Sequence, residues 1–164
     1  MKQRANEGFS LIELLMVIAI VGILAGLAIP LTINAVRSYQ LSAAVSAATG
    51  AIQSTRYAEI MHGYPGTGTP GYGYQITFTP ATNSYQVYNM VPPATTYSAV
   101  GTPVPISAPR SVTINRTVTF QFAANGTVTE TSNPVNMVFQ ITNAFGGSYH
   151  ITVTQVGNVE VTSP

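Results

Sequence analysis

The chain has 164 residues, which leaves room for one globular domain and a membrane anchor. Only 7% of its residues are charged, Asp is absent and the formal net charge is +1, so the strongly basic surface typical of nucleic-acid-binding proteins is missing. Cysteine is absent as well, which excludes disulfide bonds, thiol nucleophiles and cysteine-ligated metals. The fold must therefore rest on its apolar core.

A short polar segment comes first and a long apolar segment follows it. Residues 1–8 include Lys2 and Arg4, which favours the cytoplasmic side of a membrane for this end. The run from Leu11 to Ile29 is close to the ~20 residues that cross the hydrocarbon core as a helix, and Glu13 is its only charged residue. We therefore predict a leader over residues 1–8 and a transmembrane helix over about residues 11–30.

The candidate cleavage site lies between Gly8 and Phe9, before the apolar run. An ordinary secretory signal is cut after its apolar region, at a small-residue motif, and loses that region. An uncleaved transmembrane anchor is the alternative, but it needs no motif at Gly8 and leaves the position of Glu13 unexplained. We favour cleavage that keeps the apolar helix in the mature chain.

Glu13 is the residue of this segment for which we expect a partner of opposite charge. A carboxylate in the hydrocarbon core costs about 2.5–3.5 kcal/mol on insertion scales, so we expect a compensating cation. The amino group that cleavage would expose on Phe9 of a neighbouring copy is a candidate, and the pair would favour lateral assembly of helices. A carboxylate wetted by headgroups near the helix start is the alternative.

The apolar helix is predicted to continue well beyond the membrane, over residues 9–62 in all. Gly22 and Gly26 form a G-x-x-x-G pair that would allow close helix packing, although glycine is also common in membrane helices. Pro30 would kink or locally open the helix. Beyond it, apolar residues recur at steps of three and four and predict a one-sided helix that stops at residues 63–66: Leu41, Val45, Ala48, Ile52 and Thr55.

Residues 63–164 alternate like a β-rich head. About seven strands are predicted: Tyr72–Thr79, Tyr85–Val91, Val112–Ala123, Thr127–Thr131, Val135–Thr142, Tyr149–Thr154 and Val159–Val161. Pro92 to Arg110 holds five prolines and is predicted to be a long irregular loop, either a partner surface or a solvated insertion. The predicted fold class is α+β, with the one-sided half of the helix packed against an antiparallel head of two sheets.

Little in the chain points to catalysis or to a cofactor. Residues 66–71 match G-x-G-x-x-G, but a helix precedes them and a strand follows, the reverse of the phosphate-binding context. His62 and His150 are the only histidines and no zinc or serine-hydrolase motif accompanies them, so we expect no enzyme, cofactor or metal. Five tyrosines would suit either base stacking or, more simply, sheet packing: Tyr64, Tyr72, Tyr74, Tyr85 and Tyr88.

DNA binding is a second rival class. Arg110 and Arg116 are its candidate contacts, and two arginines on a neutral head predict weak, salt-sensitive binding. Ordinary solvated arginines are the simpler interpretation, and the charge balance argues against nucleic acid as a partner.

The hexapeptide from Gly8 to Glu13, with a short basic leader before it and a long apolar helix containing Pro30 after it, resembles the type III signal of type IV prepilins and pseudopilins. The resemblance implies that a prepilin peptidase cuts after Gly8 and methylates the new N-terminal Phe9. It also implies that Glu13 guides docking of each subunit into a helical filament, with other pilin subunits and an inner-membrane assembly platform as partners. The chain would first be a single-pass inner-membrane protein, with its head in the periplasm or outside.

The head is similar in its spacing to the C-terminal half of H-type minor pseudopilins and their pilus-tip relatives. The similarity lies in residues 120–126, in the strands over 135–142 and 149–155, and in residues 156–159. It implies two packed sheets on the C-terminal half of the helix. The cysteine-bounded loop of many major pilins is absent, which favours a minor subunit or a cysteine-free lineage. We predict a structural subunit of a type IV pilus or a type II secretion pseudopilus; a major pilin and a DNA-binding minor pilin are the alternatives.

Overall fold

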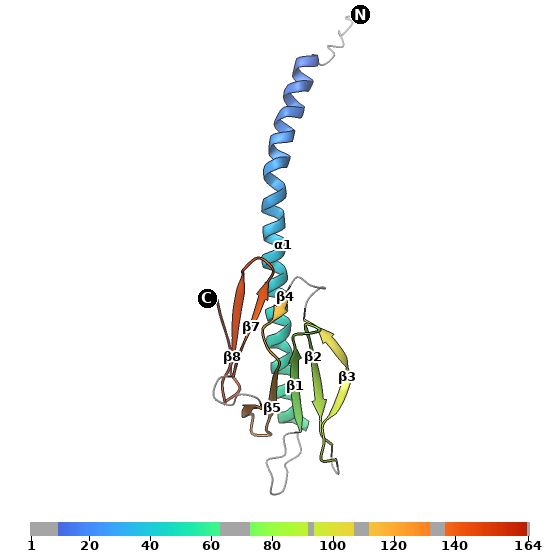
Figure 1. Ribbon diagram of the computed structural model, residues 1–164, viewed down its shortest axis with the longest axis vertical. Coiled ribbons are helices and arrows are strands. Elements are labelled where there is room, and N and C mark those ends of the chain that lie inside the picture. Colours follow the sequence, from blue (N-terminus) through green and yellow to red (C-terminus); the bar gives the residue numbers. More distant parts are fainter. Residues whose placement is uncertain (1–9, 63–72, 92–93, 107–111, 132–136, 164) are drawn as a thin grey trace, which may run out of the picture. The chain divides into compact units, whose positions relative to one another are not determined.

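The computed structural model describes residues 10–62, 73–91, 94–106, 112–131 and 137–163, apart from the side chains at positions 30 and 31. Its contacts divide the chain into two units, Met1–Val36 and Arg37–Pro164. One helix, α1 (Leu11–His62), contributes to both (Figure 1). The helix ends at His62, as predicted, and continues through Pro30, whereas the predicted start at residue 9 lies outside the described residues. The second unit is the head.

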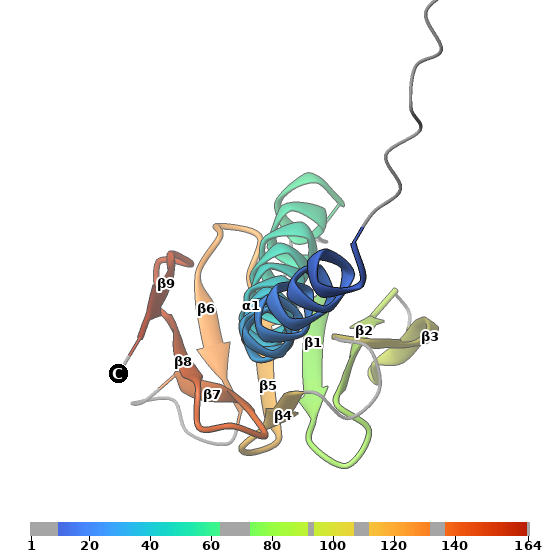
Figure 2. The same ribbon diagram turned by 90° about the horizontal axis from the view of Figure 1, so that it is seen from above.

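The described part of the head contains nine strands in two antiparallel sheets. The first sheet has the order β3-β2-β1-β5-β6 and the second has the order β4-β7-β8-β9. The first-sheet strands are β1 (Tyr74–Thr79), β2 (Ser84–Asn89), β3 (Ser98–Pro105), β5 (Val118–Phe122) and β6 (Val128–Glu130). Those of the second sheet are β4 (Val112–Ile114), β7 (Val138–Asn143), β8 (Ser148–Val153) and β9 (Val159–Thr162). Figure 2 shows the strands spread along one side of the head's helix segment.

The core forms where the one-sided half of α1 meets both sheets. All five residues of the predicted helix face are buried, from Val45 at 7% exposed to Ile52 at 0%. The sheets meet through phenylalanines: the rings of Phe78 in β1 and Phe139 in β7 stack with centroids 4.9 Å apart, and Phe120 in β5 lies 6.1 Å from Phe139. Aromatic pairs add about 0.5–1.5 kcal/mol beyond their burial. The predicted α+β fold with two sheets is therefore confirmed.

The region from Pro92 to Arg110 was predicted to be an irregular loop, and this is wrong for its middle. Ser98–Pro105 forms β3, an edge strand that pairs with β2 across a bulge between Tyr85 and Val87. An edge strand tolerates Pro103 and Pro105 because one row of its backbone groups needs no partner strand. Gln86 fills the bulge: its Nε2 donates to the carbonyl oxygens of Val87 and Val100, at 2.9 Å each.

The single strand predicted over Val112–Ala123 is also wrong, since it divides into β4 and β5, one in each sheet. The two-residue alternation of apolar and polar side chains continues across the corner at residues 115–117. This pattern alone therefore does not reveal the change of sheet. With β3, this division raises the predicted seven strands to nine in the described residues. The remaining strands lie where they were predicted, within a few residues at each end.

Candidate functional site

The N-terminal candidate site lies at the start of α1. Gly8 and Phe9 lie outside the described residues. Ser10 caps the helix: its Oγ accepts a hydrogen bond from the Ile12 N–H at 3.2 Å, and its carbonyl oxygen accepts from the Glu13 N–H at 3.0 Å. This cap satisfies amides that would otherwise lack a partner at the helix start.

Glu13 is exposed in the first turn that Ser10 caps. Its carboxylate is therefore close to the partial positive charge of the helix N-terminus, which stabilises an anion by about 0.3–1 kcal/mol when exposed. The S-x-x-E spacing of Ser10 and Glu13 is the sequence signature of a helix start, and it was overlooked in the sequence analysis. The helix thus supports a charged Glu13 locally, and a partner charge remains a prediction.

The apolar part of α1 is exposed along its length. An 18-residue window of the helix has a mean hydropathy of 2.8 and none of that window is buried, so α1 is long and apolar enough to cross a membrane. An added Cβ at Gly22 or Gly26 would meet no atom within 4 Å. The G-x-x-x-G face is therefore open to another helix, whereas its use as a packing site remains a prediction.

In the head, Arg56 of α1 forms hydrogen bonds with two tight turns. Its Nε donates to the Gly126 carbonyl oxygen at 3.1 Å in the β5–β6 turn, and its Nη2 donates to the Val156 carbonyl oxygen at 2.9 Å in the β8–β9 turn. Gly157 has a φ of +83°, and a Cβ there would lie 2.3 Å from Arg56 Nε. Glycine is thus required at position 157 for both backbone conformation and space.

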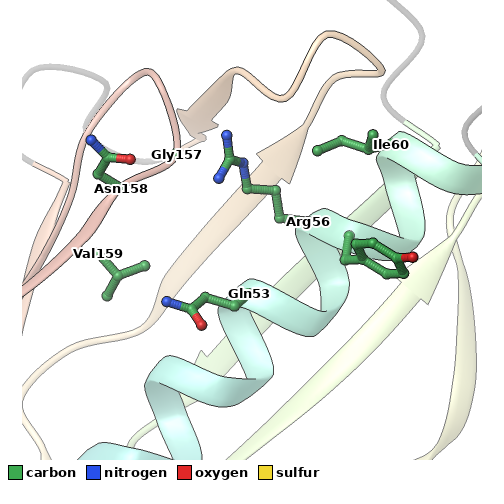
Figure 3. Close-up of a pocket in the computed structure, with 7 residues that line it drawn as sticks. Gln53, Arg56, Ile60, Gly157, Asn158 and Val159 are labelled. Carbon is green, nitrogen blue, oxygen red and sulfur yellow. The ribbon is translucent and has the colours of Figure 1, made fainter.

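The same arginine forms the wall of an open hollow of about 440 Å³. In Figure 3, Arg56 extends from α1 toward the turn that carries Gly157 and Asn158, with Gln53 beside Val159. Exposed Tyr57 and Ile60 complete the lining from α1. Sequence analysis did not identify this hollow, because its residues come from positions about 100 apart along the chain.

A second contact joins α1 to the β7–β8 turn. The Arg37 guanidinium carbon lies 3.3 Å from the centroid of the Phe145 ring, while Phe145 itself remains 61% exposed. Gly147 of the same turn lies against Leu41, since an added Cβ would be 3.2 Å from the Leu41 Cδ2 atom. Arg37 and Arg56 therefore each join α1 to one end of the β7-β8-β9 meander.

Of the two arginines proposed for DNA, Arg110 lies outside the described residues and Arg116 lies in the β4–β5 connection. Arg116 forms a bidentate ion pair with Glu130, whose side chain is fully buried, and its Nη2 donates to the Glu130 Oε2 atom at 2.9 Å. Its Nε also donates to the Val138 carbonyl oxygen at 3.0 Å. The pair raises the pKa of Arg116 and connects β6 of the first sheet with β7 of the second.

Glu59, near the end of α1, is a buried carboxylate that sequence analysis passed over. Neither of its oxygens has a hydrogen-bond partner of normal geometry among the described residues. Burial raises the pKa of Glu59, and the backbone N–H groups of Gly73 and Tyr74, which face the carboxylate, reduce this effect in part. A Cβ on Gly73 would lie 2.9 Å from Oε2 of Glu59.

The remaining predicted features divide between sheet packing and undescribed residues. The Tyr85 ring lies tilted against the Phe78 ring, with the centroids 5.9 Å apart, and packs against the core, as the sheet interpretation predicted. Tyr64, Tyr72 and the glycine-rich segment 66–71 lie outside the described residues. In the part of the chain that the structure describes, no three His, Cys, Asp or Glu side chains gather into a metal-binding group.

Comparison with known proteins adds one match. Residues 3–29 match the model of the prokaryotic N-terminal methylation motif, a range that includes the predicted cleavage position between Gly8 and Phe9 and the apolar run that follows it. Neither a curated protein nor a solved structure matches the chain significantly.

Proposed function

We propose that this type IV pilin-like chain, with its N-terminal methylation motif and its helix-and-two-sheet fold, is a structural subunit of a type IV pilus or type II secretion pseudopilus. A prepilin peptidase would cut after Gly8 and methylate Phe9. The helix would hold the chain in the inner membrane as a single span and would later pack with other subunits in the filament. The observation that carries the proposal is the methylation motif placed on an exposed apolar helix with one acid in its first turn.

We further propose that the subunit is a minor, H-type-like pseudopilin. Two features support this: the two sheets share one core with the C-terminal half of α1, and the chain lacks cysteine. The ratio of this subunit to the others in purified filaments tests the assignment: a minor subunit is present at a few copies per filament, whereas an abundant one is a major pilin.

Processing is tested with Gly8→Ala. We expect this variant to keep its leader and to stay in the membrane fraction as the longer precursor on a gel. Gly22→Ala is the matched control, since it makes the same change at a position with open space around it, and it should be trimmed normally. Normal trimming of Gly8→Ala would contradict the leader assignment.

Assembly is tested with Glu13→Ala. We expect this variant to be trimmed like the native chain but to be lost from sheared filaments, because the carboxylate that would pair with a neighbouring Phe9 amine is gone. Glu160→Ala, which removes an exposed acid from β9 of the head, should assemble normally. Equal incorporation of both variants would remove the pairing argument.

A further inference from the structure

Two Asn-x-Thr sequences lie in the head, each in a connection between strands. Asn115-Arg116-Thr117 forms the β4–β5 corner, and Asn125-Gly126-Thr127 lies in the β5–β6 turn. In exported proteins this pattern is the acceptor of N-linked glycans, provided that the middle residue is not proline. The pattern is short, so the surroundings of each asparagine must decide whether it can serve as an acceptor.

Asn125 is exposed, and its side chain folds back on the threonine two positions later. Its Oδ1 atom accepts hydrogen bonds from the Thr127 N–H at 3.0 Å and from the Thr127 hydroxyl at 2.7 Å, the arrangement of an Asx turn. A backbone N–H can only donate, so the atom that it contacts must be the oxygen. The amide nitrogen Nδ2, which would carry a glycan, has no hydrogen-bond partner in the described part of the chain.

The turn that carries Asn125 is closed by its own backbone. The Ala123 N–H donates to the Thr127 carbonyl oxygen at 2.9 Å, and the Gly126 N–H donates to the Ala123 carbonyl oxygen at 2.7 Å. All of these contacts join residues at most four positions apart, so the turn can form before distant parts of the head pack. Arg56 of α1 then holds the Gly126 carbonyl oxygen from its Nε atom, at 3.1 Å.

Asn115 lies in a different setting, although it is exposed as well. Its Oδ1 atom accepts a hydrogen bond from the Gln140 N–H at 2.9 Å, and its own N–H donates to the Gln140 carbonyl oxygen at 3.0 Å. Gln140 is 25 positions away, so this arrangement needs β7 in place. Of the two sequences, the one at Asn125 is therefore the one whose asparagine and threonine side chains are joined by a local turn.

A glycan on Asn125 would leave the hydrogen bonds of the turn intact. Glycosylation replaces one hydrogen on Nδ2, whereas the turn uses Oδ1. A glycan is bulky and hydrophilic and needs a surface position. Asn125 provides such a position, while the neighbouring Gly126 is buried. The modified chain thus keeps every contact that closes the turn.

We propose that Asn125 is an N-glycosylation site and that Asn115 is not. In the reaction, Nδ2 of Asn125 forms a bond with the anomeric carbon of a sugar, and the bond from that carbon to the diphosphate of a polyprenyl-linked donor breaks. The polyprenyl diphosphate leaves, and the amide proton passes to a base of the transferase. The proposal rests on the proposed function, because the head must reach the outer side of the inner membrane.

Trypsin separates the two candidate sites. The last two cleavage positions are Arg110 and Arg116, and no Lys or Arg follows them. Digestion of the full-length chain, purified from the cells that naturally produce it, therefore places Asn115 in residues 111–116 and Asn125 in residues 117–164. Mass spectrometry should find the peptide 117–164 with an added glycan that fragmentation locates on Asn125. The peptide 111–116 should have its unmodified mass.

Several results would overturn the proposal. The peptide 117–164 might be found only at its unmodified mass, or only with the small mass gain of a deamidated Asn125. A glycan located on a threonine, or an equal amount of glycan on Asn115, would also contradict the assignment.

The same digest tests the proposed function separately. Trimming after Gly8 gives a peptide over residues 9–37 that carries one methyl group on Phe9. If this peptide is present but 117–164 is unmodified, the proposed function stands and the glycosylation proposal fails. If the chain keeps its leader but carries a glycan on Asn125, the leader assignment fails and the glycosylation site stands.

Substitutions test the role of each side chain by the same readout. Asn125→Gln should lose the glycan, and Asn115→Gln, which makes the same change at the other sequence, should keep it. Thr127→Ser retains the hydroxyl and should keep the glycan, whereas Thr127→Val retains the shape of the side chain without the hydroxyl and should lose it. A glycan retained in Thr127→Val, or lost in Asn115→Gln, would contradict the proposal.

Discussion

The ion pair between Arg116 and Glu130 provides the sharpest test of how the two sheets are held together. Arg116 donates to both carboxylate oxygens of Glu130 at the end of β6 and to the Val138 carbonyl oxygen at the start of β7. Arg116→Met keeps much of the side-chain volume but removes all of these donors. It leaves the Glu130 carboxylate, which is fully buried, without its cation.

The size of the effect follows from the exposure of each partner. Removing one partner of a buried ion pair costs about 3–5 kcal/mol of unfolding free energy, because the other charge stays buried and unpaired. The Arg116 side chain is 29% exposed, so water can reach part of the vacated space. We therefore expect Arg116→Met to lower the free energy of unfolding by about 3 kcal/mol, near the lower limit.

The measurement is urea unfolding of the full-length chain in a mild detergent, followed by tyrosine fluorescence and extrapolated linearly to water. Glu130→Leu and the double variant Arg116→Met with Glu130→Leu complete a double-mutant cycle. Replacing both charges by apolar groups is often close to neutral, so the double variant should regain most of the lost stability. A loss below about 1 kcal/mol for Arg116→Met would show an ordinary surface pair and refute the reasoning.

Three further changes test other parts of the head, each with the same unfolding measurement. Gly146→Ala and Gly157→Ala both place alanine at positive φ, which costs about 1–2 kcal/mol of unfolding free energy. Only Gly157→Ala also puts a Cβ 2.3 Å from Arg56, so its loss of stability should be larger by a further ~1–3 kcal/mol. Equal losses for the two variants would contradict the packing of Arg56 on this turn. Glu59→Gln should stabilise the chain at neutral pH, because burial raises the pKa of Glu59 in the folded state. The contribution of Glu59 to native stability therefore falls as pH rises above about 4.3, the ordinary pKa of glutamate. It levels off once the pH exceeds the raised pKa. Glu59→Gln lacks this decrease in stability, so the difference in unfolding free energy between the variant and the native chain should vanish below pH ~4. A difference that does not change with pH would indicate an effect of packing instead. Gln86→Ala should cost about 1–3 kcal/mol because it removes the donor to the Val87 and Val100 carbonyl oxygens in the β2–β3 bulge. Gln121→Ala, whose side chain makes one 3.4 Å bond on the same sheet, should cost less. Similar losses would remove the special role of Gln86.

The helix and the general fold could be predicted because they depend on local patterns. The apolar run and the one-sided repeat after Pro30 determine a helix, and Leu41, Ile52 and their neighbours on that face are buried as their spacing requires. The nature of β3 could not be read locally. Its prolines suggest a loop, and only pairing with β2, together with the Gln86 side chain in the bulge, makes it a strand.

The side-chain contacts of the head were beyond sequence reasoning for a different reason. Arg56 binds carbonyls 70 and 100 positions away, and Arg116 finds its acid 14 positions away, in a different strand. Nothing in the spacing of charges along the chain indicates these partners. The helix cap at Ser10, by contrast, can be predicted from the sequence, because its S-x-x-E pattern involves residues only three positions apart.

The arginines of the head bear on how this protein makes contact with others. Among the described residues of the head, Arg37 lies on Phe145, Arg56 donates to two turn carbonyls and Arg116 pairs with Glu130. Each of these charges thus has a structural role inside the head, and two of them hold opposite ends of the same meander to α1. Binding to a phosphate backbone depends on several cations that can reach it together, and its strength falls with salt in proportion to their number. The distribution of charge therefore favours a head whose contacts are apolar and hydrogen-bonded, on a helix whose exposed apolar half is the larger surface for assembly.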